Sequence, residues 1–295
     1  MSLTILVTGA SSGIGNLSAK ALAKQGHTVY ASMRKINSRN KDKAEDIIQF
    51  ATANNARIIP VEMDILSQES VNTAVQTIIE QQGKIDVVVH NAGHLVVGVA
   101  EAFSTEEMAA VYDTNVLGTQ RVNRAVLPYM RKAKDGLLVW VSSTTVKGAF
   151  PPFMGPYVAA KAAMDNLALT MSYEIAPLGI ETAFIIPGAF TQGTAHFPNA
   201  GTPSDKETVN AYAEVSELSK ELDARLSGLI PADAHPQAVA EAIVNVVGTP
   251  KGQRPFRTVI DFIGDGAEEV TDLSEKLRIE FMKRIGLDAM LTPAL

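Results

Sequence analysis

Short apolar runs recur along the chain, and a stretch with helical spacing follows each of them. Six runs rich in β-branched residues predict strands, at residues 3–7, 28–32, 57–61, 85–90, 137–141 and 182–186. After the first run, Ile14, Leu17, Ala21 and Leu22 are spaced as on one face of a helix. Continuous apolar strands that alternate with helices are typical of a parallel sheet buried on both faces. Right-handed connections between such strands predict an α/β fold, a doubly wound parallel sheet with helices on both faces.

Residues 191–235 interrupt this alternation after the sixth strand. Four residues there recur at three- or four-residue spacing and predict an amphipathic helix: Tyr212, Val215, Leu218 and Leu222. Glycines and prolines precede this helix, and insertions at the carboxyl ends of parallel strands often cover ligands. We therefore expect a helical lid, hinged at its start, with these side chains facing a substrate pocket. The alternative is a surface segment that packs against the protein without covering a ligand.

The C-terminal residues 264–295 predict a helical extension. Val270, Leu273, Leu277 and Phe281 repeat at helical spacing there, and a plain packing element is one interpretation of them. No internal repeat or Gly/Ser-rich linker divides the chain, so residues 1–295 are expected to form a single domain.

The composition narrows the class of protein. With 46% hydrophobic and 20% charged residues over 295 positions, it is ordinary for a globular protein. A net charge of −6 argues against a nucleic-acid partner, and no apolar run approaches the roughly 20 residues needed for a membrane span. The N-terminus shows no charged leader, and the absence of cysteine fits a reducing compartment, so we expect a cytoplasmic protein. The five histidines lack metal-ligand spacing, so no metal site is expected.

A glycine-rich turn, Thr8-Gly9-Ala10-Ser11-Ser12-Gly13-Ile14-Gly15, joins the first strand to the first helix. Glycines let the backbone turn tightly and approach a pyrophosphate without Cβ collisions. The helix N-terminus behind them offers free N–H groups and the positive end of a dipole. This position after the opening strand predicts a dinucleotide site rather than a plain turn.

Several further motifs follow this turn in a fixed order: Asp64, Asn91-Ala92-Gly93, Asn115, Ser142-Ser143, Tyr157-x-x-x-Lys161 and Pro187-Gly188. Together with the glycine turn, they resemble the short-chain dehydrogenase/reductase family, in its compact single-domain branch. The resemblance covers residues 3–190 closely, and its nearest look is the hydroxysteroid and retinol dehydrogenase side of the family. It implies a Rossmann-like fold and hydride transfer with a nicotinamide cofactor.

The end of the second strand bears on the choice between NAD and NADP. A carboxylate there would bind the ribose 2′-hydroxyl, but the chain reads Ser32-Met33-Arg34-Lys35 with no Asp or Glu. Ser32 and Arg34 could instead hold a 2′-phosphate, so NADP (NADPH) is expected. A solvated basic face is the alternative interpretation of Arg34 and of the nearby Lys35, Arg39, Lys41 and Lys43.

The turn and the resemblance together give the expected cofactor-binding residues: Gly9, Ser11, Ser12, Gly13, Ile14, Gly15, Ser32, Arg34, Asp64, Ile65, Asn91, Ala92, Gly93, Tyr157, Lys161, Pro187, Gly188 and Thr191. The resemblance implies that Asp64 holds the adenine ring and that the residues after the sixth strand hold the nicotinamide. His90 departs from the family's usual Asn and is interpreted as structural.

Four residues are the expected catalytic group. Tyr157 and Lys161 lie four apart on a predicted helix and therefore share a face. Ketone reduction needs a proton donor beside the carbonyl oxygen, and a positive Lys161 would favour the Tyr157 phenolate by Coulomb attraction. The family pattern implies Ser143 as the hydroxyl that binds the carbonyl oxygen, with Ser142 as the fallback. It also implies that Asn115 holds a water that links Lys161 to solvent.

These features predict an NADP(H)-dependent oxidoreductase that transfers hydride between nicotinamide and a carbonyl or secondary alcohol. A small-molecule ketone or aldehyde is the expected substrate. It is expected to be apolar because five aromatic residues are candidates for the pocket wall: Phe150, Phe153, Phe190, Phe197 and Tyr212. A homodimer or homotetramer is possible from the resemblance. Two alternatives stay open, a non-catalytic dinucleotide sensor or scaffold and an epimerase or dehydratase that uses the same Tyr and Lys.

Overall fold

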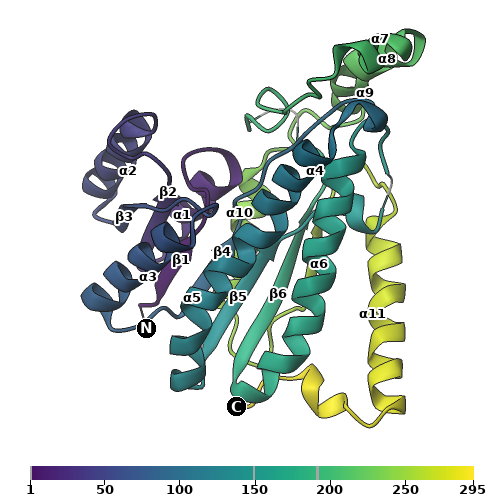
Figure 1. The fold of residues 1–295 in the computed structure, drawn as a ribbon. Coiled ribbons are helices and arrows are strands. Elements are labelled where there is room, and N and C mark those ends of the chain that lie inside the picture. Colours follow the sequence, from purple (N-terminus) through teal and green to yellow (C-terminus); the bar gives the residue numbers. More distant parts are fainter. Residues whose placement is uncertain (1, 149, 191–192) are drawn as a thin grey trace.

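In the computed structural model, which describes residues 2–148, 150–190 and 193–295, seven parallel strands form one sheet in the order β3-β2-β1-β4-β5-β6-β7 (Figure 1). The strands are β1 (Thr4–Val7), β2 (Thr28–Met33), β3 (Arg57–Glu62), β4 (Val87–His90), β5 (Gly136–Val141), β6 (Ile180–Pro187) and β7 (Arg257–Ile260). The order reverses between β1 and β4, which confirms the doubly wound α/β fold and places a ligand crevice at their carboxyl ends.

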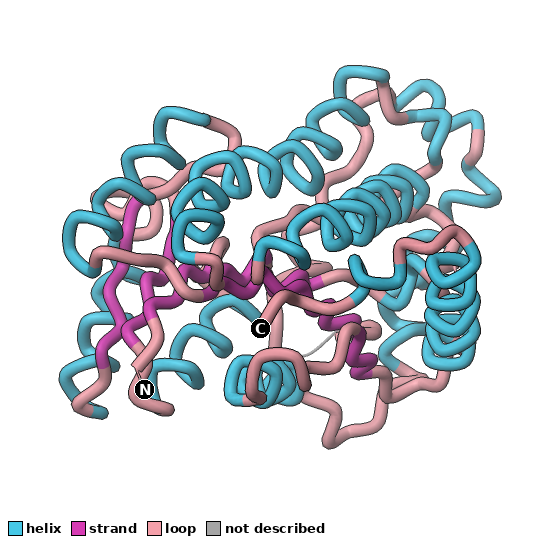
Figure 2. The backbone as a smooth tube through the Cα atoms, turned by 90° about the horizontal axis from the view of Figure 1, so that it is seen from below, coloured by secondary structure: helices cyan, strands magenta, loops and turns pink. Residues whose placement is uncertain are grey.

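Helices cover both faces of this sheet, as the end-on view shows (Figure 2). The helices are α1 (Gly13–Lys24), α2 (Lys41–Asn54), α3 (Gln68–Gln82), α4 (Thr105–Tyr112), α5 (Gly118–Ala133), α6 (Gly155–Ile175), α7 (Lys206–Ala211), α8 (Ala213–Lys220), α9 (Leu222–Ser227), α10 (Gln237–Gly248) and α11 (Ala267–Arg284). Short 3₁₀ turns lie at Ala100–Ala102, Thr144–Val146, Ala176–Leu178 and Asp288–Leu291, and a π-helical turn spans Asp113–Leu117.

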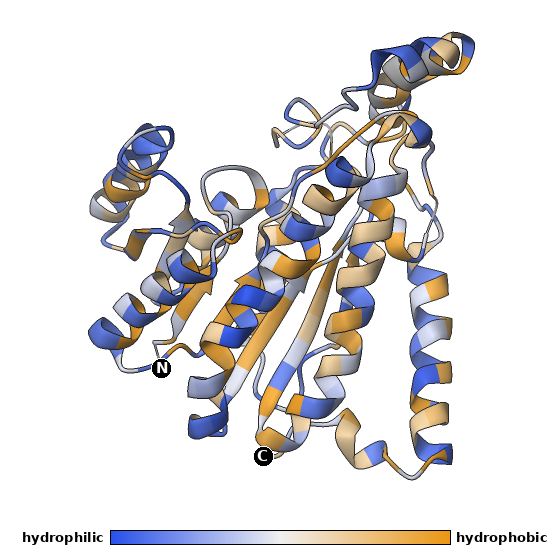
Figure 3. Ribbon diagram, viewed as in Figure 1, coloured by the Kyte–Doolittle hydropathy of each residue, from blue (hydrophilic) through white to orange (hydrophobic). Residues whose placement is uncertain are grey.

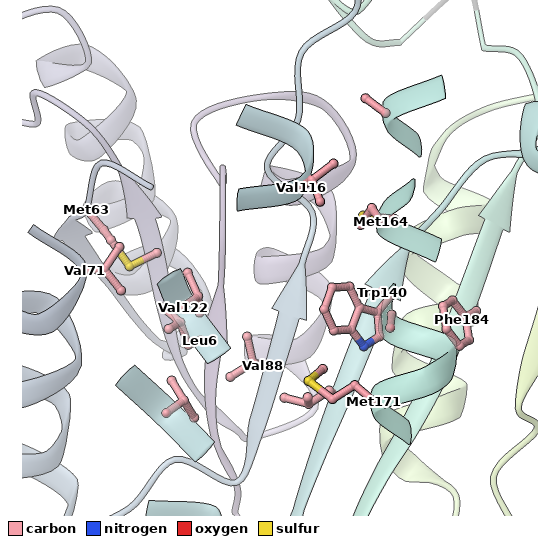
Figure 4. Packing of buried hydrophobic residues seen from close by; sticks show 14 of the residues in the cluster. Leu6, Met63, Val71, Val88, Val116, Val122, Trp140, Met164, Met171 and Phe184 are labelled. Atoms are coloured by element: carbon pink, nitrogen blue, oxygen red, sulfur yellow. The ribbon is translucent and has the colours of Figure 1, made fainter. Parts of the chain in front are cut away.

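Alternate residues of the strands serve the two halves of the core. Leu6, Val88 and Trp140 point to the side covered by α3, α4, α5 and α6 (Figure 4). Their neighbours Val7 and Val89 belong to the cluster on the other side, beneath α1, α2 and α10. Because side chains alternate along a strand, a strand covered on both faces has to be apolar at successive positions. Figure 3 shows the resulting orange strands at the centre of the molecule.

The six expected strands are present, and β7 is an addition at the edge of the sheet. Its residues are only half-buried, and the chain around it carries Arg254, Arg257 and Asp261. An edge strand lacks a second neighbour and needs no continuous apolar run, so the pattern that revealed the other strands is weak here. The β-branched run Thr258-Val259-Ile260 was its available signal.

The segment after β6 forms three short helices, α7, α8 and α9, beyond the carboxyl ends of the strands (Figure 1). The expected single helix is therefore divided, with breaks near Tyr212 and Glu221. The expected C-terminal extension is present as α11, which packs against the edge strand β7.

Candidate active site

The turn between β1 and α1 has no room for side chains at its glycines. Gly9 has a φ of +66°, and a Cβ on it would lie 2.8 Å from the Ala92 Cα. A Cβ on Gly15 would lie 2.5 Å from the Gly9 carbonyl oxygen and would strike Asn91 Nδ2. This close packing leaves the N-terminus of α1 open to the cavity, which suits a pyrophosphate.

Hydrogen bonds tie this turn to the end of β4. The Asn91 side-chain amide donates to the carbonyl oxygens of Thr8, at 2.9 Å, and Gly9, at 3.2 Å. The backbone N–H groups of Asn91 and Ala92 donate to Thr8 Oγ1, each at 3.0 Å. The Asn91-Ala92-Gly93 motif therefore holds the turn in place and itself lines the cavity.

The structure brings Arg34, Arg39 and Asn40 to the cavity, but not Ser32. The Asn40 side chain donates to the Arg34 carbonyl oxygen at 2.6 Å and closes the loop that carries both arginines. Ser32 lies within β2, where helices cover both faces, and its side-chain oxygen is buried without a hydrogen-bond partner. Ser32 therefore does not line the cavity at which its phosphate contact was expected, whereas Arg39 brings a second cation to it.

The other expected cofactor residues lie along the same cavity. Ser11, Ser12, Gly13 and Ile14 line it beside the turn, and Asp64 and Ile65 line it after β3. Asp64 Oδ1 accepts from the Leu66 N–H at 3.1 Å, which orients its side chain. Pro187 and Gly188 line the cavity at the carboxyl end of β6, together with Ala189 and Phe190. Thr191 lies outside the described residues.

Tyr157, Lys161 and Ser143 meet at the carboxyl end of β5, and all three are buried. Lys161 donates to the Val141 carbonyl oxygen at 2.7 Å, which fixes α6 against β5. The Ser143 hydroxyl accepts from the Thr145 hydroxyl at 2.9 Å and interacts with the Tyr157 phenol. Ser142, the fallback, donates its hydroxyl to Asp165 at 2.7 Å. The two serines are thus distinguished by their partners.

Asn115 lies in the π-helical turn between α4 and α5. Its side-chain amide donates to the carbonyl oxygens of His94, at 3.0 Å, and Val111, at 2.9 Å. Its Oδ1 accepts from the His94 N–H at 3.1 Å, and a Cβ on Gly93 would lie 2.8 Å from the same oxygen. A π turn widens a helix locally and is frequent at functional sites. Here it connects Asn115 to the segment after β4.

Burial dominates the protonation of the central pair. It raises the pKa of Tyr157 to about 12, and the Ser143 contact only partly opposes this effect. Burial also lowers the pKa of Lys161 to about 8, while the charge of Asp165 acts in the opposite direction. In the protein alone, desolvation rather than attraction to Lys161 therefore sets the direction in which the pKa of Tyr157 moves.

A chain of charged side chains continues behind Lys161. Arg257 in β7 donates to both oxygens of Asp165, at 2.7 and 3.0 Å, and its guanidinium stacks on the Phe184 ring. Arg257 also contacts Glu275 at 3.3 Å, and Glu275 pairs with Arg278 at 2.7 Å. These contacts connect the catalytic end of α6 to β7 and α11 through the interior.

The cavity that contains these groups has a volume of about 980 Å³. Beyond Tyr157 its wall is mainly apolar and comes from several loops and from the segment after β6: Phe150, Pro152, Met154, Phe197, Leu222, Leu226 and Leu229. His94 and His196 also line it, and the His196 ring lies edge-on to Tyr157 at 5.7 Å between centroids. Burial lowers the pKa of His196 to about 4, so its imidazole is neutral at physiological pH.

Part of the expected pocket wall faces elsewhere. Tyr212 hydrogen-bonds Glu101, and Val215 and Leu218 are about half exposed. Phe153 also lies away from the cavity, whereas Leu222 of the expected helix reaches it. A break before Leu222 separates α8 from α9, so Leu222 is buried at the cavity while Val215 and Leu218 on α8 are exposed.

His90 is buried and stacks on Trp140 with 4.2 Å between ring centroids. Burial lowers its pKa to about 3, so it packs as a neutral ring beneath the site. Among the described residues, no three side chains of His, Asp or Glu gather as a metal ion would require. No helix in the described ranges has both the length and the apolarity to cross a membrane.

Comparison with known proteins agrees with this geometry. The family model for short chain dehydrogenases matches residues 3–202, about two thirds of the chain. The chain belongs to the short-chain dehydrogenase/reductase family. The resemblance drawn from the motifs is thereby confirmed, and the protein is an oxidoreductase of this family.

Three relatives of this short-chain dehydrogenase/reductase span most of its length. The 3-ketodihydrosphingosine reductase of Bacteroides thetaiotaomicron is 31% identical over 87% of each chain. Human retinol dehydrogenase 8 is 29% identical over 96% of this chain and 89% of its own. Among solved structures, a variant of the actinorhodin polyketide ketoreductase with NADPH has a TM-score of 0.73, at 25% identity over 90% and 97% of the two chains.

Three residues at the site of this short-chain dehydrogenase/reductase escaped the sequence reasoning: Arg39, Asp165 and His196. In the sequence, Arg39 stood out only as one of several basic residues near Arg34. Asp165 follows Lys161 by four positions, so its place on the same helix face was available from spacing. Nothing in the sequence indicated that His196 would reach Tyr157, because the two residues are far apart in the chain and only the fold brings their rings together.

Proposed function

We propose that this oxidoreductase is NADP(H)-dependent and interconverts an apolar ketone or aldehyde with the corresponding alcohol. The observation that carries the proposal is the meeting of Ser143, Tyr157 and Lys161 in one cavity with the glycine turn. A non-catalytic dinucleotide sensor would have no chemical need for this buried group. The site thus favours catalysis over binding alone.

In the proposed reduction, the hydroxyls of Ser143 and Tyr157 bind the carbonyl oxygen, and Tyr157 donates the proton to it. The positive charge of Lys161 stabilises the phenolate that Tyr157 becomes. The nicotinamide dinucleotide, when bound, supplies the hydride to the carbonyl carbon. His196 and the apolar wall keep water away from Tyr157, since together they cover it on the substrate side.

NADP is the proposed cofactor because two arginines, Arg34 and Arg39, line the cavity after β2, and the stretch from Ser32 to Lys35 contains no Asp or Glu. A guanidinium binds phosphate through charge-assisted, often paired hydrogen bonds. The ketoreductase with a related structure holds NADPH, in line with this choice.

The apolar wall around Phe197, Leu222 and Leu226 supports an extended hydrocarbon substrate. The wall continues outward to Leu229 and Phe150, which are 64% and 65% exposed at the rim. The relatives named for 3-ketodihydrosphingosine and retinol are consistent with such a substrate.

The proposal is tested by NADPH consumption, followed by absorbance, with 2-alkanones of increasing chain length and with matching aldehydes. We expect kcat/KM to rise with chain length, since each buried CH₂ contributes about 0.8 kcal/mol. Tyr157→Phe keeps the ring but removes the proton, so turnover should fall at least about 100-fold. The control Tyr129→Phe changes a tyrosine on α5 outside the cavity and should leave turnover unchanged. Undiminished turnover in Tyr157→Phe would refute the proposed chemistry.

The apolar wall has its own pair of variants. Leu222→Ala should raise KM for long substrates several-fold with little effect on short ones, because it removes part of the wall. Leu218→Ala, on the neighbouring helix but 49% exposed, is the control and should leave KM unchanged. Equal effects of the two substitutions would contradict the proposed substrate path.

A further inference from the structure

The side of α11 that faces the protein is mixed, with Ala267 and Met282 buried near its two ends and polar residues between them. Thr271 is 3% exposed there, and Ser274 accepts a hydrogen bond from Lys147 at 3.4 Å. Glu275 and Arg278 continue this side and join the buried Arg257. A surface helix normally turns its apolar side to the protein body, whereas most apolar residues of α11 lie outside this buried side.

The apolar stripe of α11 faces solvent instead. Val270, Leu273, Leu277 and Phe281 are 46%, 58%, 54% and 56% exposed. Their spacing of three, four and four residues aligns them on one side of the helix over about 17 Å. Ile285, 47% exposed, extends the stripe just past the helix end. Figure 3 shows orange bands recurring along α11 at the outer edge of the molecule.

The charges beside this stripe are ordered so that an antiparallel copy of the same helix would present the opposite charge at each position. At 100° per residue, five exposed charged residues fall on one flank of the stripe, and Arg284 lies at the side of the stripe next to that flank. Their order along the chain is acidic, acidic, basic, acidic, basic, basic: Glu269, Asp272, Lys276, Glu280, Lys283 and Arg284. From the C-terminal end of the helix, the same series has the opposite charge at every position. An identical helix laid antiparallel therefore meets opposite charges along the whole flank.

A twofold axis near Leu277 satisfies both patterns at once. Leu277 would then face its own copy, and Leu273 would face Phe281 of the second molecule. On the flank, Glu269 would lie near Arg284, Asp272 near Lys283 and Lys276 near Glu280. Such an interface is isologous, with the same patch on both molecules, and it closes after two copies.

A lipid surface fits this helix less well. Helices that lie on membranes carry an excess of Lys and Arg on the polar side. Between Ala267 and Arg284, α11 has five acidic and four basic residues. The mixed and ordered signs are typical of pairing with a protein partner rather than attraction to anionic lipid.

We propose that α11 is a homodimerisation surface on which α11 of a second copy packs antiparallel, with its apolar stripe buried and its charged flank paired. The proposal does not depend on the catalytic function. It explains why polar residues of α11 can contact Lys147 and Arg257 while its apolar stripe stays available.

The test is sedimentation velocity of the full chain over about a hundredfold range of concentration. We expect a species of twice the 31.5 kDa chain mass. Leu277→Lys should weaken the dimer at least tenfold, because it places two cations at the axis. Ile48→Lys changes a residue of similar exposure, 52%, on α2 and should leave the dimer intact. Circular dichroism checks that both variants are folded.

The charged flank gives a second, independent readout. Glu269→Arg alone should weaken the dimer at low salt, and the double exchange Glu269→Arg with Arg284→Glu should restore it. A monomeric wild-type chain, or a dimer that Leu277→Lys does not weaken, would overturn the proposal. A monomer that co-sediments with phosphatidylcholine–phosphatidylglycerol vesicles would also overturn it, in favour of a lipid surface.

Discussion

Asp165 and Arg257 form a bidentate ion pair in the interior, with N–O distances of 2.7 and 3.0 Å and side chains that are 1% and 3% exposed. The pair joins α6, one turn beyond Lys161, to the edge strand β7. Ser142 donates to the same carboxylate at 2.7 Å, so the pair also holds the end of β5. Three elements of the catalytic end therefore converge on one buried carboxylate.

Asp165→Asn should destabilise the protein by about 3 kcal/mol, because it leaves the buried Arg257 guanidinium with only the longer contact to Glu275. Urea unfolding measures the change. The double variant Asp165→Leu with Arg257→Met removes both charges and should recover part of the loss, since the burial cost of the charges disappears with them. Purely additive losses would contradict the coupling of the two side chains.

Ser143→Ala and Ser142→Ala should separate catalysis from structure. Ser143 lies beside Tyr157, so its loss should reduce kcat about 100-fold with little change in stability. Ser142→Ala removes a buried hydrogen bond to Asp165 and should cost about 1–3 kcal/mol of unfolding free energy. Steady-state kinetics and urea unfolding of the two variants, side by side, decide between them; the reversed result would make Ser142 the catalytic serine.

Arg34→Ala and Arg39→Ala should each weaken NADPH binding about tenfold while leaving NADH binding nearly unchanged. Each would remove one of the proposed charge-assisted phosphate contacts, and a tenfold loss corresponds to about 1.4 kcal/mol. Fluorescence titration with both cofactors measures the ratio. Lys43→Ala, on exposed α2 away from the cavity, is the matched control. Equal NADPH and NADH affinities in the wild type would contradict the cofactor proposal.

The rate of carbonyl reduction should fall as pH rises above about 8, where Lys161 loses its proton. Tyr157, with its pKa raised to about 12, keeps its proton over the same range and adds no step of its own. Profiles of kcat/KM from pH 6 to 9.5 measure this. Lys161→Arg stays positive throughout, so the rate that remains should show no fall near pH 8. A wild-type profile that is flat to pH 9.5 would contradict the role given to Lys161.

Local patterns were sufficient for much of the fold and part of the site. Continuous apolar runs predicted the five inner strands, because a strand covered on both faces must be apolar at successive positions, and a similar run predicted the edge strand β3. The glycine turn could be interpreted from its three glycines and its place after the first strand, since the absence of a Cβ is a property of the residue. The shared face of Tyr157 and Lys161 follows from helical spacing, which does not depend on the rest of the chain.

Tertiary packing decided what depended on distant segments. Asp165 and Arg257 are 92 positions apart, and only the placement of β7 beside β6 brings them together. Packing also sealed Ser32 inside the sheet, brought Arg39 to the cavity and turned His196 towards Tyr157. The periodicity of α11 revealed an apolar stripe but not whether this stripe faces the protein or the solvent. A repeat of 3.6 residues defines the faces of a helix, whereas its neighbours determine which face meets the protein and which stays open.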